Sequence, residues 1–389
     1  MDVRRRFPSV FYLEAAARRR MPRFCWEYLT GGAGRGMAVA RNREMLDRVR
    51  FVPRYLGDAA DRPELSTSLL GRHWDVPFGI APIGLGGLVW PRAAEHLAAT
   101  ARRHNLPFLL GSYGTVSLER IAGIAPEHAW FQHYPFNVPE IDLDLVRRAE
   151  QAGFGVLVLT VDIPTATRRP HDVRNGLAVP PRMNVENMLQ MMAKPQWALA
   201  MLASGVPRFE SLLPYVPKGL DMAGLGTWLA ERHEGHTTLK HLATLRDAWP
   251  RKLVVKGLYH PADVEDCRRL GIDGVAISNH GGRNVEGVPT AIEMLPEIRK
   301  VSGEMAVIAD GGVRTGLDVA RLIASGAGFV LAGRAFMFGV AAMGAGGGDR
   351  VAEILKHELH QTMAHIGCPT LADLPRALHG AEALDADTA

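Results

Sequence analysis

The sequence contains little cysteine and no long hydrophobic run. Its three cysteines, Cys25, Cys267 and Cys368, are too few and too widely spaced for a disulfide framework or a zinc site. We therefore expect reduced thiols in a cytoplasmic protein. No uninterrupted run of about 18 apolar residues occurs, and no apolar segment follows the first arginines. The pattern thus predicts neither a membrane-spanning helix nor a secretory signal.

The charge shows no concentrated block of one sign. Lys and Arg number 45 against 41 Asp and Glu, and basic residues cluster only in the triplets 4–6 and 18–20. A nucleic-acid-binding protein usually carries a basic stripe with a reading motif, so we expect no nucleic-acid partner. The triplets predict a solvated surface or, as an alternative, contact with an anionic membrane. His357 and His360 are three residues apart, which is not the HExxH spacing, so we predict a surface helix and no metal site.

Short apolar runs alternate with amphipathic segments along most of the chain. Continuous apolar strands that alternate with helices are typical of a parallel sheet covered on both faces. Eight such units favour the α/β class and a (β/α)8 TIM barrel, forming one domain over residues 1–389. The predicted strands are 78–82, 108–112, 129–134, 155–162, 252–258, 274–280, 305–312 and 329–333.

Three segments lie outside this repeat. An amino-terminal extension contains MPRFCWEYL, which predicts a helix with Pro22 in its first turn. After the fourth strand, an insertion at about 176–240 is rich in methionine, tryptophan and proline, including Pro180, Pro181 and Met183. It could be a lid, a membrane-surface segment or an excursion packed on the barrel. The tail at about 376–389 is expected to be flexible.

The stretch ISNHGGRN at the end of the sixth run carries the strongest chemical signal. A histidine at a strand end can act as a base near neutral pH, which suits His280. The planar guanidinium of Arg283 can hold a carboxylate through two hydrogen bonds, and the intervening glycines allow a close approach. Asp162, at the end of GVLVLTVD, can orient an imidazole, although a structural ion pair is the alternative.

The last two strands are followed by glycines and arginines. In many barrels a phosphate binds after strands seven and eight, so DGGVR and GR predict a phosphate site that includes Arg314 and Arg334. Lys256 ends the fifth strand, where a fixed cation could stabilise charge on a redox ring. No GxGxxG follows a strand, so no nicotinamide site is expected.

SNHGGR, together with WFQHY, LTVD, VKG, DGGVR and GR in this order, resembles the FMN-dependent α-hydroxyacid dehydrogenase/oxidase family from about residue 10 to 375. The resemblance implies FMN as the cofactor and oxidation of an (S)-2-hydroxy acid to a 2-oxo acid. It implies a catalytic set in which His280 is the base, Asp162 its partner and Tyr134 the group that holds the substrate hydroxyl. Arg283 and Tyr28 would hold the substrate carboxylate, and Arg169 would be a second arginine on the substrate side.

The same resemblance implies an FMN site built from the strand ends. The residues of this site are those that match the family's flavin-binding motifs. They are Ala81, Pro82, Ile83, Gly84, Ser112, Gln132, Thr160, Lys256, Ser278, Asp310, Gly311, Gly312, Arg314, Gly333 and Arg334.

APIGLGGLVWP, KPQWALAML and AHIGCPTLADL resemble the bacterial (S)-mandelate dehydrogenase branch. This implies an aromatic substrate such as (S)-mandelate, a membrane quinone or other acceptor, a homo-tetramer, and a cytoplasmic location with peripheral contact at the cytoplasmic face of the inner membrane. The alternatives are a soluble lactate or glycolate type oxidase that makes hydrogen peroxide, and a non-catalytic barrel scaffold. The absence of a catalytic cysteine loop argues against an inosinate dehydrogenase barrel.

Overall fold

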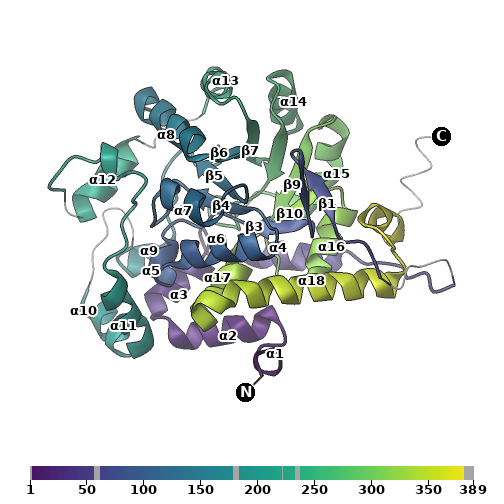
Figure 1. The fold of residues 1–389 in the computed structure, drawn as a ribbon, viewed down its shortest axis with the longest axis horizontal. Coiled ribbons are helices and arrows are strands. Elements are labelled where there is room, and N and C mark those ends of the chain that lie inside the picture. Colours follow the sequence, from purple (N-terminus) through teal and green to yellow (C-terminus); the bar gives the residue numbers. More distant parts are fainter. Residues whose placement is uncertain (1, 57–61, 178–183, 221, 233–236, 381–389) are drawn as a thin grey trace.

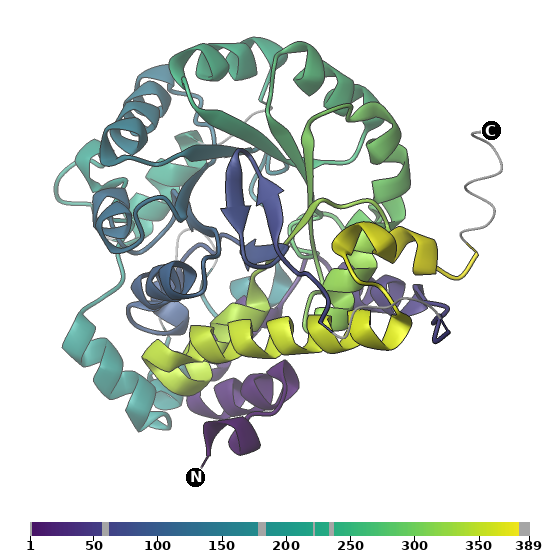
Figure 2. The same cartoon turned by 45° about the vertical axis from the view of Figure 1, so that its right-hand side comes forward.

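The computed structural model describes residues 2–56, 62–177, 184–220, 222–232 and 237–380. Eight parallel strands form a closed barrel in the order β10-β3-β4-β5-β6-β7-β8-β9, with helices around it (Figures 1 and 2). Each strand lies within one of the predicted apolar runs, so the (β/α)8 prediction is confirmed. The strands are β3 (Phe78–Ile80), β4 (Phe108–Gly111), β5 (Ala129–His133), β6 (Val156–Thr160), β7 (Lys252–Leu258), β8 (Gly274–Ile277), β9 (Ala306–Asp310) and β10 (Phe329–Ala332).

After each barrel strand the chain forms a helix that packs around the barrel, and after β3 and β6 it forms additional helices. Seven of these covering helices return the chain to the next strand, as a parallel barrel requires. Glycine ends α8 in the left-handed conformation that favours this residue, with φ of +94° at Gly153. The covering helices are α6 (Ala93–Arg103), α7 (Leu118–Ile124), α8 (Pro139–Ala152), α13 (Leu239–Ala248), α14 (Pro261–Arg269), α15 (Ala291–Val301), α16 (Gly316–Ala324) and α17 (Arg334–Met343).

Further helices extend the barrel at both ends of the sequence. The predicted amino-terminal helix is present as α3, with Pro22 one position before its first residue. His357 and His360 lie on α18, and no cluster of three or more metal-ligating side chains occurs among the described residues. These elements are α1 (Val3–Arg6), α2 (Val10–Arg20), α3 (Arg23–Thr30), α4 (Met37–Arg48), α5 (Gly86–Val89), α18 (Gly347–Ile366) and the 3-10 helices η2 (Gly344–Gly346) and η3 (Leu371–Ala377).

Side chains alternate between the barrel interior and the helix layer. In β6, Val156 and Val158 belong to the interior cluster, whereas Leu157 and Leu159 pack in the larger cluster beneath the helices. This alternation follows from the two-residue period of a strand. Residues on the inward register therefore reach the open carboxyl end of the barrel, and residues on the outward register face the helices.

A hairpin closes the amino-terminal end of the barrel (Figure 2). Its strands are β1 (Thr67–Leu69) and β2 (Arg72–Trp74), paired antiparallel. Trp74 is 1% exposed and packs with Leu69 in the interior cluster. Burying a side chain of this size contributes roughly 1.5–3 kcal/mol. This plug was not expected from the sequence.

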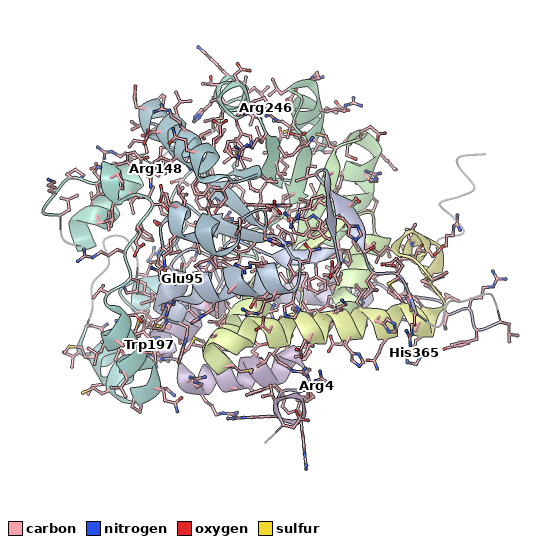
Figure 3. The ribbon with its side chains drawn as sticks, in the orientation of Figure 1. Arg4, Glu95, Arg148, Trp197, Arg246 and His365 are labelled. Carbon is pink, nitrogen blue, oxygen red and sulfur yellow. The ribbon has the colours of Figure 1, made fainter. Side chains whose placement is uncertain are left out.

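The insertion after β6 is helical where it is described. Trp197 on α11, labelled in Figure 3, is 3% exposed, and its indole N–H donates to the carbonyl of Val89 at 3.2 Å. Leu212 is fully buried, and the backbone N–H of Leu118 donates to Oγ of Ser211 at 3.1 Å. The insertion is therefore packed on the barrel at two places. The short helix α9 (Pro170–Arg174) precedes it, and its own elements are α10 (Val185–Met192), α11 (Pro195–Ser204), the 3-10 helix η1 (Leu213–Tyr215) and α12 (Met222–Arg232).

Some predictions concern residues outside this description. Pro180, Pro181 and Met183 lie outside the described residues, as do residues 381–389 of the tail, so its flexibility stays a prediction. The assignment of residues 1–389 to a single domain likewise stays a prediction. Among the described helices, none is both long enough and apolar enough to cross a membrane.

Candidate active site

The polar residues that end the strands converge at the carboxyl end of the barrel. Nδ1 of His280 lies 3.0 Å from Oδ1 of Asp162, and its Nε2 lies 3.2 Å from the hydroxyl of Tyr134. These three residues follow β8, β6 and β5 respectively. The sequence prediction that they belong to one site agrees with this geometry.

The protonation of this group follows from its surroundings. Burial raises the pKa of Asp162. The charge and hydrogen bond of His280, together with the charge of Lys256, lower it by more, so the net pKa is below the ordinary value. Burial also raises the pKa of Tyr134, and the charge of Asp162 adds to this effect. The site therefore holds a carboxylate behind the imidazole and a protonated phenol in front of it.

The loop after β8 adopts an unusual backbone conformation. His280 has φ of +56°, a left-handed value that is uncommon for residues with a side chain. Gly282 has φ of +79°, and a Cβ atom there would lie 2.6 Å from the backbone nitrogen of Val39. The glycine therefore lets this loop pack against α4. The loop is thus held in a conformation that aims His280 into the barrel mouth.

A second glycine admits Asp162. Gly257, within β7, has φ of +98°, and a Cβ atom there would lie 2.5 Å from Cβ of Asp162. The strand pairing with β8 shifts register between Lys256 and Leu258. Such an irregularity re-aims side chains next to a site. Gly257 leaves the space that the carboxylate partner of His280 occupies.

A pair of arginines lies beside this group. The guanidinium of Arg283 lies 5.0 Å from the ring centroid of Tyr28, and Arg283 and Arg169 lie 3.8 Å and 3.5 Å from Oδ2 of Asp172. The Tyr28 hydroxyl donates to the carbonyl of Gly84 at 3.0 Å. Burial lowers the pKa of Arg283, and the charge of Arg169 lowers it further. One carboxylate shared by two cations leaves positive charge for an anionic ligand.

Buried polar residues line the strand ends on the other side of the barrel mouth. Nζ of Lys256 donates to Oγ of Ser278 at 2.6 Å and lies 2.9 Å from Oδ2 of Asp310. The amide of Gln132 donates to the hydroxyl of Thr160 at 2.9 Å. All five residues are at most 9% exposed. A buried amine, amide and hydroxyls match the polar edge of a flavin ring.

The residues present fit FMN. Oδ1 of Asp310 is buried without a hydrogen-bond partner, so a donor on a bound ligand would satisfy it. Burial lowers the pKa of Arg334 to about 9, and the nearby charges of Arg283 and Arg314 contribute to the shift. Such a concentration of buried positive charge favours an anion, as the phosphate of FMN would supply.

Arg334 has a further role that the sequence did not predict. Its Nε donates to the carbonyl of Leu29 at 2.8 Å, Nη1 to Gly281 at 2.8 Å and Nη2 to Gly31 at 2.9 Å. The side chain thus joins α3, the loop after β8 and the start of α17. Direct contact between Arg334 and a phosphate stays a prediction.

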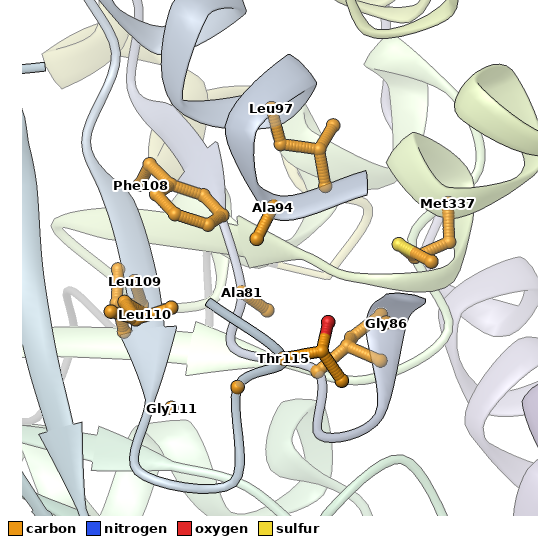
Figure 4. Close-up of a pocket in the computed structure, with 12 residues that line it drawn as sticks. Ala81, Gly86, Ala94, Leu97, Phe108, Leu109, Leu110, Gly111, Thr115 and Met337 are labelled. Atoms are coloured by element: carbon orange, nitrogen blue, oxygen red, sulfur yellow. The ribbon is translucent and has the colours of Figure 1, made fainter. Parts of the chain in front are cut away.

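Apolar and small residues border the same end of the barrel. Figure 4 shows Ala81, after β3, and Gly111, at the end of β4, beside a narrow pocket that Thr115 and Met337 also line. A Cβ atom at Gly333 would lie 3.3 Å from Cδ1 of Ile83. These close approaches place the APIG turn (81–84) against the start of α17, as a shared cofactor site requires.

The predicted FMN residues are positioned as follows. Ser112 is fully buried, and its Oγ accepts from the backbone N–H of Tyr134 at 3.4 Å. Gly311 and Gly312 form the turn after β9, where a Cβ atom at Gly312 would lie 2.8 Å from the carbonyl oxygen of Asn42.

Arg314 lies 5.0 Å from the ring centroid of Phe338. Pro82 is partly buried in the APIG turn.

Aromatic rings form one wall of the site. Tyr113 packs against Tyr134 with ring centroids 5.2 Å apart, and Phe209 from the insertion packs on Tyr113 at 5.5 Å. Asp162 and Asn284 line a cavity of about 470 Å³ that Arg168 also borders. The site therefore combines cations, the His280–Asp162 pair and an aromatic wall.

Two functional candidates were missed by sequence reasoning. The carboxylate of Asp172 forms ion pairs with both Arg283 and Arg169. The side-chain amide of Asn284 donates to the carbonyl oxygen of Asp162 at 2.8 Å. Asp172 lies in a short helix whose position the strand pattern does not fix. Asn284 directly follows the SNHGGR motif, and that adjacency was the one available signal.

Comparisons with known proteins agree with this geometry. Residues 17–380 match the family described as FMN-dependent dehydrogenase. The chain is 33% identical over 356 residues to the (S)-mandelate dehydrogenase of Pseudomonas putida, covering 92% of this chain and 89% of that relative. It is similar to a crystal structure of the monotopic membrane protein (S)-mandelate dehydrogenase, with a TM-score of 0.91, 32% identity and 95% and 98% of the two chains covered. A structure of mandelate oxidase with 3,3-difluoro-2-hydroxy-3-phenylpropionic acid gives a TM-score of 0.78, 32% identity and coverage of 96% and 98%.

Proposed function

The chain belongs to the FMN-dependent dehydrogenase family and is an FMN-dependent oxidoreductase of (S)-2-hydroxy acids, and from this premise we propose that its substrate carries an aromatic side chain, as (S)-mandelate does. The observation that carries the proposal is the contact of His280 with both Asp162 and Tyr134 beside an aromatic wall. When bound, FMN supplies the two-electron acceptor that a 2-hydroxy acid needs to become a 2-oxo acid.

His280 is the proposed base. Its Nε2 faces the Tyr134 hydroxyl, so it also faces the position of a substrate hydroxyl held by that tyrosine. The proton that leaves the substrate binds to Nε2, and the resulting imidazolium is stabilised by Asp162 at Nδ1. Because the net pKa of Asp162 is lowered, the carboxylate remains charged through this step.

Arg283, Arg169 and Tyr28 are the proposed clamp on the substrate carboxylate. Both guanidinium groups approach the carboxylate of Asp172, and Nη1 of Arg283 also donates to the backbone carbonyls of Tyr28 and Gly31. One carboxylate between two cations leaves positive charge that can bind a substrate carboxylate. Lys256, Gln132, Thr160 and the other strand-end residues are proposed to hold FMN. The clamp and the base then fix a 2-hydroxy acid by its two functional groups.

The aromatic wall supports a bulky substrate. Tyr113 and Phe209 present rings 5.5 Å apart next to Tyr134. Aromatic rings pack favourably with centroids about 4.5–7 Å apart, so this wall can accept the ring of an aromatic substrate. The names of the similar proteins contain mandelate in each case, which agrees with this preference.

We also propose that the protein binds a membrane surface through α10 and α11. Six apolar residues on these helices are between 56% and 80% exposed. Along α10 they recur at intervals of three and four residues, so they share one face. An exposed apolar face on helices that do not span a membrane is typical of monotopic proteins, and one similar structure is described as monotopic. The residues are Val185, Met188, Leu189, Met192, Leu199 and Leu202.

The location at the cytoplasmic face of the inner membrane, a quinone acceptor and a homo-tetramer complete the proposal. An oxidase that uses oxygen is the second candidate, because the chain is similar to mandelate oxidase over 96% of its length. A membrane surface supplies lipid-soluble acceptors, which favours the quinone.

The deciding experiment uses purified protein loaded with FMN under anaerobic conditions. (S)-Mandelate, lactate and glycolate are added in turn, and the loss of flavin absorbance is followed before air is admitted. We expect rapid bleaching by mandelate and slow recovery in air. Rapid recovery would establish the oxidase, bleaching by lactate alone would overturn the aromatic substrate, and no bleaching by any acid would favour the scaffold alternative.

A further inference from the structure

A buried network of ionisable side chains lies on the outer face of β5, behind the site. Nε2 of His133 lies 2.7 Å from Oδ1 of Asp142 on α8, and both side chains are fully buried. Nε2 of His241 on α13 lies 2.9 Å from Oδ2 of the same carboxylate. None of these three residues takes part in the chemistry proposed above.

The network is joined to the turn that carries Tyr134. Oδ1 of Asp142 also accepts from the backbone N–H of Phe136 at 2.8 Å. Asp142 therefore binds His133 and Phe136, the residues one before and two after Tyr134 in the chain. The backbone N–H of Tyr134 itself donates to Oγ of Ser112 at 3.4 Å. The tyrosine is thus held from the barrel side and from the helix side.

The far side of this turn is held as well. The backbone N–H of Asn137 donates to the carbonyl of Arg232 at 2.9 Å, and its side-chain amide donates to the carbonyl of Glu231 at 2.9 Å. These carbonyls lie at the end of α12, so the turn between β5 and α8 is also a further point of contact with the insertion. A displacement of Asp142 would therefore disturb a turn that also contacts Ser112 and the end of α12.

The carboxylate is charged in this environment. Burial raises the pKa of Asp142, but the charge of His133 and the hydrogen bonds from its neighbours lower it more, so the net pKa is below the ordinary value. Its position in the first turn of α8 favours a negative charge. Removing the charge leaves buried donors on His133 and Phe136 with a weaker acceptor.

We propose that Asp142 is a positioning residue for Tyr134: by binding His133 and Phe136 on either side of it, the carboxylate directs the tyrosine hydroxyl toward His280. The proposal rests on the role of Tyr134 proposed above. The hydroxyl lies 3.2 Å from Nε2 of His280, so a small rotation of the turn breaks this contact. A misplacement of about 1 Å can lower a rate by about 100-fold.

A double-mutant cycle tests the proposal in the FMN-loaded enzyme. Asp142→Asn, Tyr134→Phe and the double variant are compared by kcat, KM and bound flavin. We expect Asp142→Asn to lower kcat by roughly 10-fold to 100-fold, with a smaller change in KM and with the bound flavin retained. In the double variant kcat should be no lower than in the worse single variant, because both changes remove one contact.

The other possible outcomes contradict either the role of Asp142 or the role of Tyr134. If the effects of the two substitutions on kcat multiply, the positioning role of Asp142 is wrong. The same follows if Asp142→Asn leaves kcat unchanged while Tyr134→Phe lowers it. In both cases the proposed role of Tyr134 still stands. If Tyr134→Phe leaves kcat unchanged, the role of Tyr134 is wrong and this inference falls with it.

Control variants separate positioning from loss of stability. Asp273→Asn removes a carboxylate that binds Lys252 and Arg246 at the other end of the barrel, so it should lower Tm without lowering kcat. Should Asp142→Asn fail to fold, His133→Gln and His133→Ala provide the same test. The glutamine amide can donate to Asp142, so we expect kcat close to wild type for His133→Gln and a loss for His133→Ala. Equal kcat in these two variants would contradict the proposal.

Discussion

Nδ1 of His280 lies 3.0 Å from Oδ1 of Asp162, although the two residues are 118 positions apart in the chain. The contact exists because β6 and β8 both end at the open side of the barrel, on either side of β7. Asp162 lies two residues after the end of β6 and occupies the narrow space left by Gly257. The position of the proposed base is therefore set by three neighbouring strands.

The first prediction concerns this pair. His280→Ala should leave FMN bound and lower the rate of substrate-driven flavin bleaching by about 100-fold to 10,000-fold, the usual effect of losing general-base catalysis. Asp162→Asn should give a smaller loss, since the imidazole remains but its protonated form is less stabilised. Stopped-flow absorbance measures both, and a His280→Ala enzyme at the wild-type rate would remove the base assignment.

The second prediction concerns stability at low pH. Because the folded-state pKa of Asp162 is lowered, its carboxylate stabilises the fold above the unfolded pKa of about 3.9 and loses this effect as pH falls through the folded value. The difference in Tm between wild type and Asp162→Asn should therefore shrink as the pH is lowered from about 6 toward 3. Calorimetry across this range measures it; a constant difference would mean that the charge of Asp162 contributes nothing to stability.

The third prediction concerns the carboxylate clamp. Arg283→Lys keeps the charge but loses the planar pair of donors and the contact with the Tyr28 ring. We expect kcat/KM to fall by about 10-fold or more, corresponding to at least about 1.4 kcal/mol. Arg35→Lys is a suitable control because Arg35 is an exposed arginine whose side chain contacts Met37 on the surface. Equal kcat/KM in the Arg283→Lys and wild-type enzymes would exclude the clamp.

The fourth prediction concerns Gly257. Gly257→Ala would place a Cβ atom 2.5 Å from Cβ of Asp162 at φ of +98°, so either the strand or the carboxylate must move. We expect both Tm and the bleaching rate to fall. Gly271→Ala is the matched control, since Gly271 has φ of +67° but no atom within 4 Å of the added Cβ. It should lower Tm alone, and the same pattern in Gly257→Ala would show that Asp162 tolerates the displacement.

The fifth prediction concerns membrane binding. Leu199→Ser with Leu202→Ser removes two of the six exposed apolar side chains of α10 and α11 and should reduce flotation with lipid vesicles. Val52→Ser with Leu239→Ser removes two similarly exposed residues elsewhere and serves as the control. Kinetics with a soluble acceptor should be unchanged in both variants. Wild-type protein that fails to float with vesicles would contradict the membrane proposal directly.

The barrel and much of the candidate site could be predicted from the sequence because a single rule connects them. Apolar runs mark the strands, and the polar residue after each run lies at the same end of the barrel. His280, Asp162 and Tyr134 follow this rule, and Lys256 lies near the end of its strand. The prediction required no knowledge of how the helices pack.

The remaining features depend on contacts between distant segments. Leu69 and Trp74 form an interior plug only because a short hairpin folds across the barrel, and three-residue strands give little periodic signal. Asp172 and Asp142 belong to helices, where a carboxylate near the amino end is ordinarily a solvated residue. Only the packing of these helices against strand ends reveals their partners.

The bonds of Arg334 also determine when the site can form during synthesis. Arg334 donates to the carbonyl of Leu29, 305 residues earlier in the chain. At ~5–20 residues per second, a ribosome needs about 15 to 60 s to extend the chain across that distance. Throughout that interval α3 has been made but the arginine that fastens it has not, so flavin loading is expected to follow completion of the chain rather than to accompany translation.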